Sequence, residues 1–409
     1  MTTLFEPGKI GKMDIKNRFV RSATAELLAT DDGRVTDKYL KAYKQLARGG
    51  VGLIITGNFY LNPIGQALPR SIVMHRDEIV DDLRKVVKTV HEHGAKIVAQ
   101  INHRGRQCYP NFITQKPIAP SAVRDMMSLV KPRQMAMNEI EETITAYGDA
   151  ARKVKEAGFD GVQILGAHGY MINQFLSCHT NRRKDEWGGS LDNRMRFLIR
   201  VYELIRKTVG PDYPVLIKIN GEDCFPNGVT IDQALTVCEK LDELGIDAIE
   251  VSGGIGETGF STIRGDIPRD LLIKNRNIVE KILIRLLIEK RMRKNAKFSE
   301  AYFLPYATAI KKKVNVPVIS VGGIRLRETM ENILKNKEAF PKADSLIKSL
   351  KFFPKQTITF DNGTENYRHE LVSAMTGCKT YFCNAYHSWE KGTVENTIGL
   401  IRSYVPKKT

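Results

Sequence analysis

The sequence predicts an α/β fold of the (β/α)8 TIM-barrel type. Seven short apolar runs rich in β-branched residues recur along the chain, and a segment with helical periodicity follows each of them. Strands that are apolar throughout are typical of a parallel sheet with both faces covered, which leaves a doubly wound sheet or a barrel. Seven strand–helix units favour the barrel.

The elements follow one another in a regular order. The two best-marked helices run over 77–94 and 138–158, and each ends in a glycine at the C-cap position. The predicted strands are "RFVRSA" at 18, "VGLIITG" at 51, "KIVAQI" at 96, "GVQIL" at 161, "PVLIKI" at 214, "IDAIEVS" at 246 and "VPVISV" at 316.

Composition indicates a globular chain. With 409 residues and 42% hydrophobic content, the chain can bury the hydrophobic core of one large domain and have a smaller appendage as well. No long apolar run and no charged-then-apolar leader is present, so neither a membrane span nor secretion is indicated, and we expect a cytoplasmic protein. The six cysteines are scattered without zinc spacing, which predicts reduced thiols and no metal site.

The net charge is +17, and a surplus of seven positive charges lies in one stretch, 264–297, which holds eleven Lys and Arg against four Asp and Glu. The stretch is amphipathic, and two interpretations are open: a face that binds nucleic acid or phosphate, or a solvated helix packed on a larger body. The second is favoured, so nucleic acid is not expected as a partner.

Chemistry in such barrels lies where strands end, so the residues at and just past the ends of the strands are the candidate site residues. A glycine pair suits a phosphate because bare amides can approach it, a lysine can neutralise a developing anion, and a tyrosine can donate a proton while a histidine holds a carbonyl oxygen. The residues at the strand ends are Ser22, Ala23, Thr24, Gln100, His168, Tyr170, Lys218, Gly322 and Gly323.

From about Leu4 to Asn332 the chain resembles the old yellow enzyme family of NAD(P)H:flavin oxidoreductases. The motifs are "LFEPGKIGKMDIKNRFVRSA", "GLIITG", "AQINHRGR", "GAHGYMINQFLSCHTNRRKDEWGGSLDNRMRF" and "VPVISVGGIR". The resemblance implies an FMN-containing barrel that takes hydride from NADH or NADPH and passes it to the β-carbon of an activated alkene, an enone or enoate. A homo-oligomer is compatible with it, and NADH and NADPH are not distinguished.

The resemblance also implies a role for each strand-end residue. Ser22, Ala23 and Thr24 would lie against the cofactor. Gln100 would bind the flavin pyrimidine edge, Lys218 would stabilise charge at its N1/O2 side, and Gly322 and Gly323 would meet the phosphate. His168 would bind the acceptor carbonyl oxygen, and Tyr170 would protonate the α-carbon.

Two departures from the family pattern lie near these residues. Leu165 stands where a second His or Asn often completes a pair around the carbonyl, and Ala25 stands where a Cys or Thr often lies near flavin N5. The larger departure follows the seventh strand, since no eighth strand ending in Gly-Arg is found. The barrel is therefore expected to be truncated, with domain boundaries at 1–335 and 336–409.

Residues 336–409 resemble the C-terminal part of a DDE transposase catalytic domain of the ribonuclease-H-like, integrase type. The motifs are "TFDNGTEN" and "YHSWEKGTVENTIGLIR", with Asp361 after a predicted strand and Glu395 on a predicted helix. Such carboxylates hold two divalent metal ions for phosphoryl transfer, but the first aspartate is not found upstream. We therefore interpret Asp361 and Glu395 as relic ligands of a fused fragment.

The fusion leaves three functional hypotheses. The leading one is an FMN-dependent ene-reductase whose activity truncation could impair. The alternatives are an inactive gene-fusion product and a DNA-binding or integrase-type protein acting through the tail. The segments "SLIKSL" (345–350) and "QTITF" (356–360) are candidates for a substitute eighth strand, although neither is expected to restore the phosphate site.

Overall fold

The computed structural model describes most of the chain up to Lys335 and three short segments beyond it. The described residues are 3–66, 68–107, 115–126, 128–258, 261–262, 264–265, 297–335, 340–341, 357–360 and 379–382.

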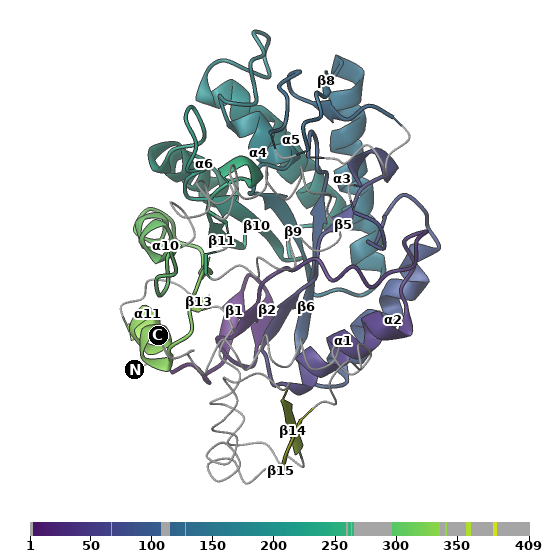
Figure 1. Ribbon diagram of the computed structural model, residues 1–409, viewed down its shortest axis with the longest axis vertical. Coiled ribbons are helices and arrows are strands. Elements are labelled where there is room, and N and C mark those ends of the chain that lie inside the picture. Colours follow the sequence, from purple (N-terminus) through teal and green to yellow (C-terminus); the bar gives the residue numbers. More distant parts are fainter. Residues whose placement is uncertain are drawn as a thin grey trace, which may run out of the picture.

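Parallel strands in sequence order form the main sheet, which curves around a central axis (Figure 1). All seven strands predicted from the sequence are present in it, and β5 (Phe59–Tyr60) pairs with β6 beside the main path. The strands of the path are β3 (Val20–Arg21), β4 (Leu53–Ile55), β6 (Lys96–Asn102), β9 (Gly161–Gly166), β10 (Val215–Asn220), β11 (Ala248–Ser252), β12 (Val318–Ser320) and β13 (Phe340–Pro341).

Helices lie outside the strands and connect them, as expected for a βα-barrel (Figure 1). The predicted helices at 77–94 and 138–158 are confirmed as α2 and α3, and the glycines that follow them, Gly94 and Gly158, have positive φ. The helices are α1 (Asp37–Arg48), α2 (Ile79–His91), α3 (Met137–Glu156), α4 (Met171–Leu176), α5 (Leu191–Val209), α6 (Ile231–Glu243), α10 (Leu304–Lys311) and α11 (Arg327–Lys335), with 3-10 turns η1 (Pro63–Gly65) and η3 (Gly256–Thr258).

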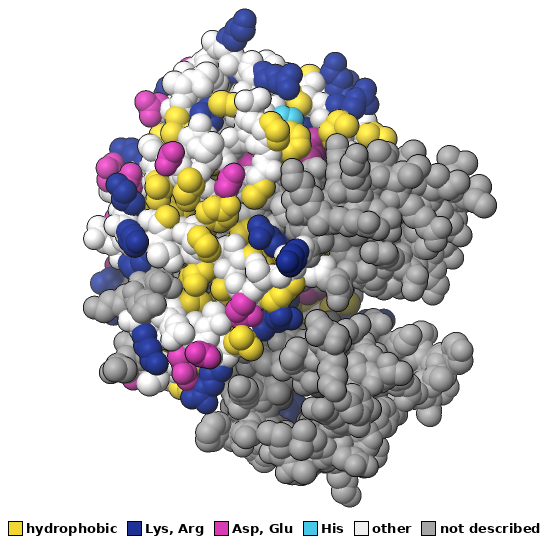
Figure 2. Space-filling model, turned by 60° about the vertical axis from the view of Figure 1, so that its left-hand side comes forward, with side chains coloured by type: hydrophobic (Ala, Val, Ile, Leu, Met, Phe, Trp, Pro, Cys, Tyr) yellow, Lys and Arg dark blue, Asp and Glu magenta, His cyan; other side chains and the backbone are white. Residues whose placement is uncertain are grey.

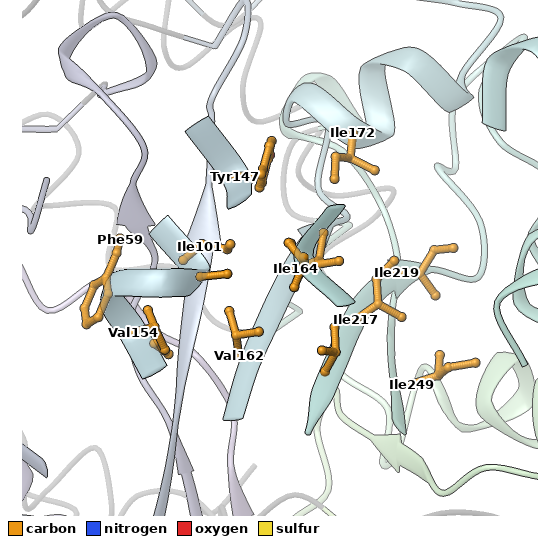
Figure 3. Close-up of a cluster of buried hydrophobic side chains, with 14 of the residues drawn as sticks. Phe59, Ile101, Tyr147, Val154, Val162, Ile164, Ile172, Ile217, Ile219 and Ile249 are labelled. Atoms are coloured by element: carbon orange, nitrogen blue, oxygen red, sulfur yellow. The ribbon is translucent and has the colours of Figure 1, made fainter. Parts of the chain in front are cut away.

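The larger hydrophobic core lies between the sheet and these helices. Figure 3 shows strand residues such as Ile101, Val162 and Ile164 in one buried cluster with Tyr147 and Val154 of α3. Each of these side chains is at most 1% exposed. Their burial supplies much of the driving force that holds helices on strands, at about 25 cal/mol per Å² of apolar surface removed from water.

A second, smaller core fills the bottom of the barrel interior. The antiparallel hairpin of β1 (Gly8–Ile10) and β2 (Met13–Ile15) contributes three of its side chains, so the chain's first strands close this end as an apolar floor. Gly11 in the hairpin turn has φ +53°, and a Cβ there would lie 2.2 Å from Asp247 Oδ1 before β11, so only glycine fits. The floor consists of Ile10, Met13, Ile15, Val20, Leu53, Ile55, Val98, Leu216, Ala248 and Ile319.

The sequence predicts a barrel truncated after its seventh strand, but the structure has an eighth strand, β13. β13 follows α11 and pairs in parallel with β12, through Ile319 with Phe340 and Ser320 with Pro341. It has only two residues and lies in neither segment proposed as a substitute. Among the described residues no pairing joins β13 to β3. These two strands are therefore the edges of the sheet, which is nearly but not fully closed.

The tail contributes a separate two-stranded sheet. Of the substitute candidates, "QTITF" forms β14 (Thr357–Phe360), which pairs in parallel with β15 (Lys379–Phe382) and not with the barrel. The other candidate, 345–350, lies outside the described residues, as do Asp361 and Glu395. A further two-stranded sheet pairs β7 (Ile118–Ala119) with β8 (Arg133–Gln134) in parallel.

The described surface mixes charges of both signs. On the face shown in Figure 2, lysine and arginine side chains are interspersed with acidic and hydrophobic ones. Most of the basic stretch 264–297 lies outside the described residues. In the part of the chain that the structure describes, no helix combines the length and apolar character needed to cross a membrane.

The floor should be essential to stability. Ile10 is fully buried in it, so Ile10→Ala should lower the free energy of unfolding by about 2–5 kcal/mol through lost transfer energy and a cavity. Urea denaturation measures this change. Leu326→Ala is the control, because that side chain is 55% exposed and its loss should cost less than about 0.5 kcal/mol. Equal stability of both variants would show that the hairpin does not seal the barrel.

Candidate active site

A layer of polar side chains crosses the barrel interior directly above the apolar floor. Side chains alternate across a strand, so residues two positions beyond a floor residue also point inward. All members of this layer are at most 4% exposed. We call it the polar layer; it consists of Gln100 on β6, Gln163 on β9, Lys218 on β10, Glu250 on β11 and Ser22 after β3.

Hydrogen bonds join the polar layer into one chain. Gln100 Nε2 donates to Gln163 Oε1 over 2.7 Å, and Gln163 Nε2 donates to Glu250 Oε2 over 2.7 Å. The other Glu250 oxygen accepts from the Ser22 hydroxyl and lies 3.1 Å from Lys218 Nζ. Lys218 Nζ also donates to Ser22 Oγ over 2.9 Å, which closes a triangle of charge and hydroxyl.

The Glu250 carboxyl is held in its ionised form. Its burial raises the pKa, but the charge of Lys218 and hydrogen bonds from Ser22, Gln163 and Lys218 outweigh that effect, so the pKa lies below its usual value. The barrel therefore carries a fixed, paired charge at its centre, with the ammonium of Lys218 positioned by the carboxylate.

His168 lies above the polar layer on the turn between β9 and α4. Its backbone is left-handed, with φ +62°, and Gly169 follows with φ +80°. His168 N donates to Asn220 Oδ1 over 3.2 Å, and the His168 carbonyl accepts from Gln107 Nε2 over 3.0 Å. His168 Nε2 lies 2.8 Å from Ser252 Oγ. The backbone of this turn is thus fixed from two neighbouring strand ends.

A buried carboxyl group, that of Asp223, stabilises the same turn through two asparagine side chains. Asn173 Oδ1 accepts from Gly169 N over 2.7 Å, and the amide groups of Asn173 and Asn220 both donate to Asp223 Oδ1, over 3.0 and 2.8 Å. Burial raises the pKa of Asp223, although four hydrogen bonds oppose it. The strained φ of His168 is therefore held by a buried network.

The imidazole of His168 is neutral. Burial, and then the positive charge of Lys218, lower its pKa to about 3. At neutral pH it can donate or accept a hydrogen bond, but it does not act as a cationic acid.

Tyr170 stands beside His168 at the start of α4. The two rings lie 6.4 Å apart between centroids, nearly perpendicular to each other. The Tyr170 hydroxyl accepts a hydrogen bond from Arg104 Nη2 at 3.5 Å, and Gln174 N binds the Tyr170 carbonyl over 2.7 Å. His168 and Tyr170 are therefore brought together at the strand ends, as the sequence predicts.

The glycine pair after β12 faces aromatic side chains. Gly322 and Gly323 have φ +98° and +69°, and a Cβ on either would lie within 3.0 Å of the Tyr302 ring. The next amides of this turn are occupied, because Glu300 Oε1 accepts from Arg325 N over 2.6 Å and Leu326 N over 2.9 Å. A carboxylate thus already uses part of the anion-binding backbone at the start of α11.

The remaining predicted residues lie near the first strand. Thr24 Oγ1 is 3.5 Å from the Ser22 carbonyl, and Ala23 packs on the floor. The Thr24 carbonyl would be 2.4 Å from a Cβ on Gly57, so it closely approaches the end of β4. Leu165, which stands where the family pattern often has a second His or Asn, is 2% exposed.

Four residues of this region were missed by the sequence analysis. The glutamate in the centre of the apolar run "AIEVS" is the clearest pattern that could have revealed one of them, since a buried charge needs a partner. They are Gln163, Glu250, Ser252 and Arg104. Within the described residues, no group of three or more His, Cys, Asp and Glu side chains is arranged to hold a metal ion.

The chain is similar to known flavin oxidoreductases over most of its length. The model of the NADH:flavin oxidoreductase / NADH oxidase family matches residues 3–255. The NADPH dehydrogenase of a Geobacillus species is 35% identical over 339 residues, which cover 83% of this chain and 88% of that protein. The chain belongs to the NADH:flavin oxidoreductase / NADH oxidase family. The family's cofactor is FMN, with NADH or NADPH as reductant, so the predicted family and cofactor are confirmed.

Two further relatives extend this result. The NADH oxidase of Thermoanaerobacter brockii is 34% identical over 379 residues, 92% of this chain but 53% of that protein, so this chain spans about half its length. The structure of the old yellow enzyme homologue from Zymomonas mobilis has a TM-score of 0.65 at 25% identity, covering 83% of this chain and 87% of that one. The barrel fold is thereby confirmed, and the transposase-like identity of 336–409 stays a prediction.

The polar layer should depend on charge balance. Glu250→Gln keeps the side chain's size but leaves Lys218 buried without its counter-ion, so the free energy of unfolding should fall by about 3–5 kcal/mol in urea denaturation at pH 7. The double variant E250Q/K218M, which removes both charges, should be more stable than E250Q alone. If the two single-variant losses simply add in the double variant, the proposed coupling is absent.

Two buried imidazoles should make the protein less stable in acid. Burial lowers the pKa of His103 to about 4, while that of His168 is about 3. The unfolded chain, with His near pKa 6.5, binds more protons between about pH 4 and 6.5, so stability should fall as pH decreases through this window, by up to about 1.4 kcal/mol per unit for each imidazole. Urea midpoints from pH 5 to 8 should depend less steeply on pH in H103Q; an unchanged slope would exclude His103 as a source.

Proposed function

We propose that this chain is an FMN-dependent NAD(P)H oxidoreductase of the ene-reductase type. The observation that carries the proposal is the polar layer, which holds an amide and a cation inside the barrel, and the charge of Lys218 acts on His168, the neighbour of Tyr170. Its acceptor would be a small alkene conjugated to a carbonyl group.

The polar layer fits a flavin ring in its chemistry. Gln100 offers an amide to the pyrimidine edge, and Lys218 offers a cation to the N1/O2 side, where reduction places negative charge. Glu250 does not remove this function, because its carboxylate positions the ammonium of Lys218. Ser22, Ala23 and Thr24 would contact the same ring from the first strand end, and Gly322 and Gly323 would meet the phosphate.

When bound, FMN takes a hydride from NADH or NADPH and supplies it to the β-carbon of the alkene. Neutral His168 would donate a hydrogen bond to the carbonyl oxygen, which gains negative charge during the reaction. The Tyr170 hydroxyl would donate a proton to the α-carbon, since a phenol with an ordinary pKa of about 10 is protonated at neutral pH. The hydrogen-bond network around Asp223 would keep the side chains of His168 and Tyr170 in position.

An inactive fusion product is the second candidate, and the phosphate end favours it. Glu300 occupies the amides of Arg325 and Leu326, and among the described residues no glycine–arginine pair follows β13. A DNA-joining function has a narrower basis, namely the transposase resemblance of 336–409 and its parallel pair of strands, β14 and β15.

Absorption spectroscopy separates these candidates. We expect the purified chain, with FMN added if none co-purifies, to show a bound flavin spectrum that bleaches under anaerobic NADH or NADPH and returns when 2-cyclohexenone is added. A protein that retains no flavin after gel filtration would support the inactive fusion product instead. Metal-dependent nicking of DNA by the chain would support the third function.

Tyr170→Phe tests the proton donor. Removing the hydroxyl should slow the reoxidation by 2-cyclohexenone about 10²- to 10⁴-fold, the range for a lost general acid. The bleaching step with NADH or NADPH, recorded without the alkene, should change far less. Reoxidation at the wild-type rate would rule out Tyr170 as the donor.

A further inference from the structure

Arg104 places a guanidinium group directly on the proposed proton donor. Its Cζ lies 5.2 Å from the centroid of the Tyr170 ring and 5.6 Å from that of Tyr60, and its Nη2 donates to the Tyr170 hydroxyl at 3.5 Å. The side chain belongs to a residue that is only 7% exposed. Two aromatic faces therefore hold a cation inside the strand-end region.

The backbone of Arg104 is fixed on both sides. Arg104 N donates to Gly65 O over 3.1 Å, and the Arg104 carbonyl accepts from Gln174 Nε2 over 3.0 Å and from Gln107 N over 3.2 Å. Gly105 follows with φ +59°, and a Cβ there would lie 2.2 Å from Gln174 Oε1. The guanidinium is thus presented from a rigid turn whose other contacts lead to the helix that Tyr170 begins.

In this position Arg104 would lie next to one part of a bound acceptor, the substituent on its α-carbon. The Tyr170 hydroxyl is proposed to meet the α-carbon, so a group 3.5 Å from that hydroxyl reaches the substituent that the α-carbon carries. A guanidinium matches a carboxylate better than a ketone, since its planar fork donates two parallel hydrogen bonds to the two oxygens.

Reduction of a conjugated carboxylate also requires a cation. Hydride addition to the β-carbon breaks the alkene π bond and moves its electron pair toward the carboxylate, which then carries additional negative charge. His168 is neutral and can only hydrogen-bond to it. A fixed guanidinium stabilises that charge, and it does so more in the transition state than in the ground state.

We propose that Arg104 is a specificity-determining residue that binds the carboxylate of a 2-enoate, an acceptor whose double bond is conjugated to an ionised carboxyl group. This inference rests on the proposed function. The balanced reaction consumes one enoate, one NAD(P)H and one proton. The hydride becomes the new β C–H bond, the Tyr170 proton becomes the new α C–H bond, and solvent reprotonates Tyr170; the products are the saturated carboxylate and NAD(P)+.

Binding of two matched ligands tests the site without turnover. 3-Phenylpropanoate carries the carboxylate, and 4-phenyl-2-butanone replaces it by a methyl ketone of similar shape. By calorimetry at pH 7 and low salt, with FMN present, we expect the wild-type protein to bind the acid at least about tenfold more tightly, as charge-assisted hydrogen bonds imply. Arg104→Gln should remove that preference, and Arg104→Lys should restore part of it.

The control is Arg124→Gln, which removes the same charge from an exposed arginine whose Nη1 donates to Leu129 O. It should retain the acid preference, which separates binding at Arg104 from a general effect of net charge. Equal binding of acid and ketone by the wild type, or a preference that survives in R104Q, overturns the inference.

Turnover with the matching alkenes separates this inference from the proposed function. With trans-cinnamate and 4-phenyl-3-buten-2-one, R104Q should lower kcat/KM for the acid at least about tenfold more than for the ketone. If the chain binds no FMN but still prefers 3-phenylpropanoate through Arg104, the carboxylate site stands and the ene-reductase proposal fails. If both alkenes turn over and R104Q affects them equally, the ene-reductase proposal stands and this inference fails.

Discussion

The buried ion pair between Lys218 and Glu250 is the constraint on which the barrel interior depends. Neither charge tolerates isolation at this depth, so the strands that carry them, β10 and β11, must pair in the register that sets the two residues side by side. Gln163 and Ser22 satisfy the remaining carboxylate lone pairs. Burial of this ion pair costs desolvation free energy, but the pair therefore also fixes the position of a cation above the floor.

Successive layers of side chains along the barrel axis have different roles. Apolar side chains at the bottom supply cohesion, the polar layer supplies a fixed electrostatic field, and the turns above it supply the groups that would handle an acceptor. Each level uses alternate residues of the same strands, since every second side chain points inward. A change on one level, such as Leu165 in place of a polar residue, can therefore alter the ligand without disturbing the sheet below it.

The sequence predicts the strands well and their partners poorly. Seven strands could be recognised because long apolar runs need a covered sheet, whereas β13 has two residues and no periodicity to detect. His168 and Tyr170 lie two positions apart, so their proximity is local. Glu250 and Arg104 acquire their roles from residues distant in the chain, through strand register and through a turn held by Gln174, and no local pattern encodes those distances.

The hairpin of β1 and β2 has a consequence for how the chain folds. Its residues are synthesised well before β11 and β12, yet Ile10 shares the floor with Ala248 and Ile319. Contacts of such long sequence separation carry a high loop-closure entropy and slow folding. The N-terminal hairpin therefore lacks its full set of partners until β12 has been synthesised, and during that interval its apolar face is a surface on which chaperones or premature aggregation would act.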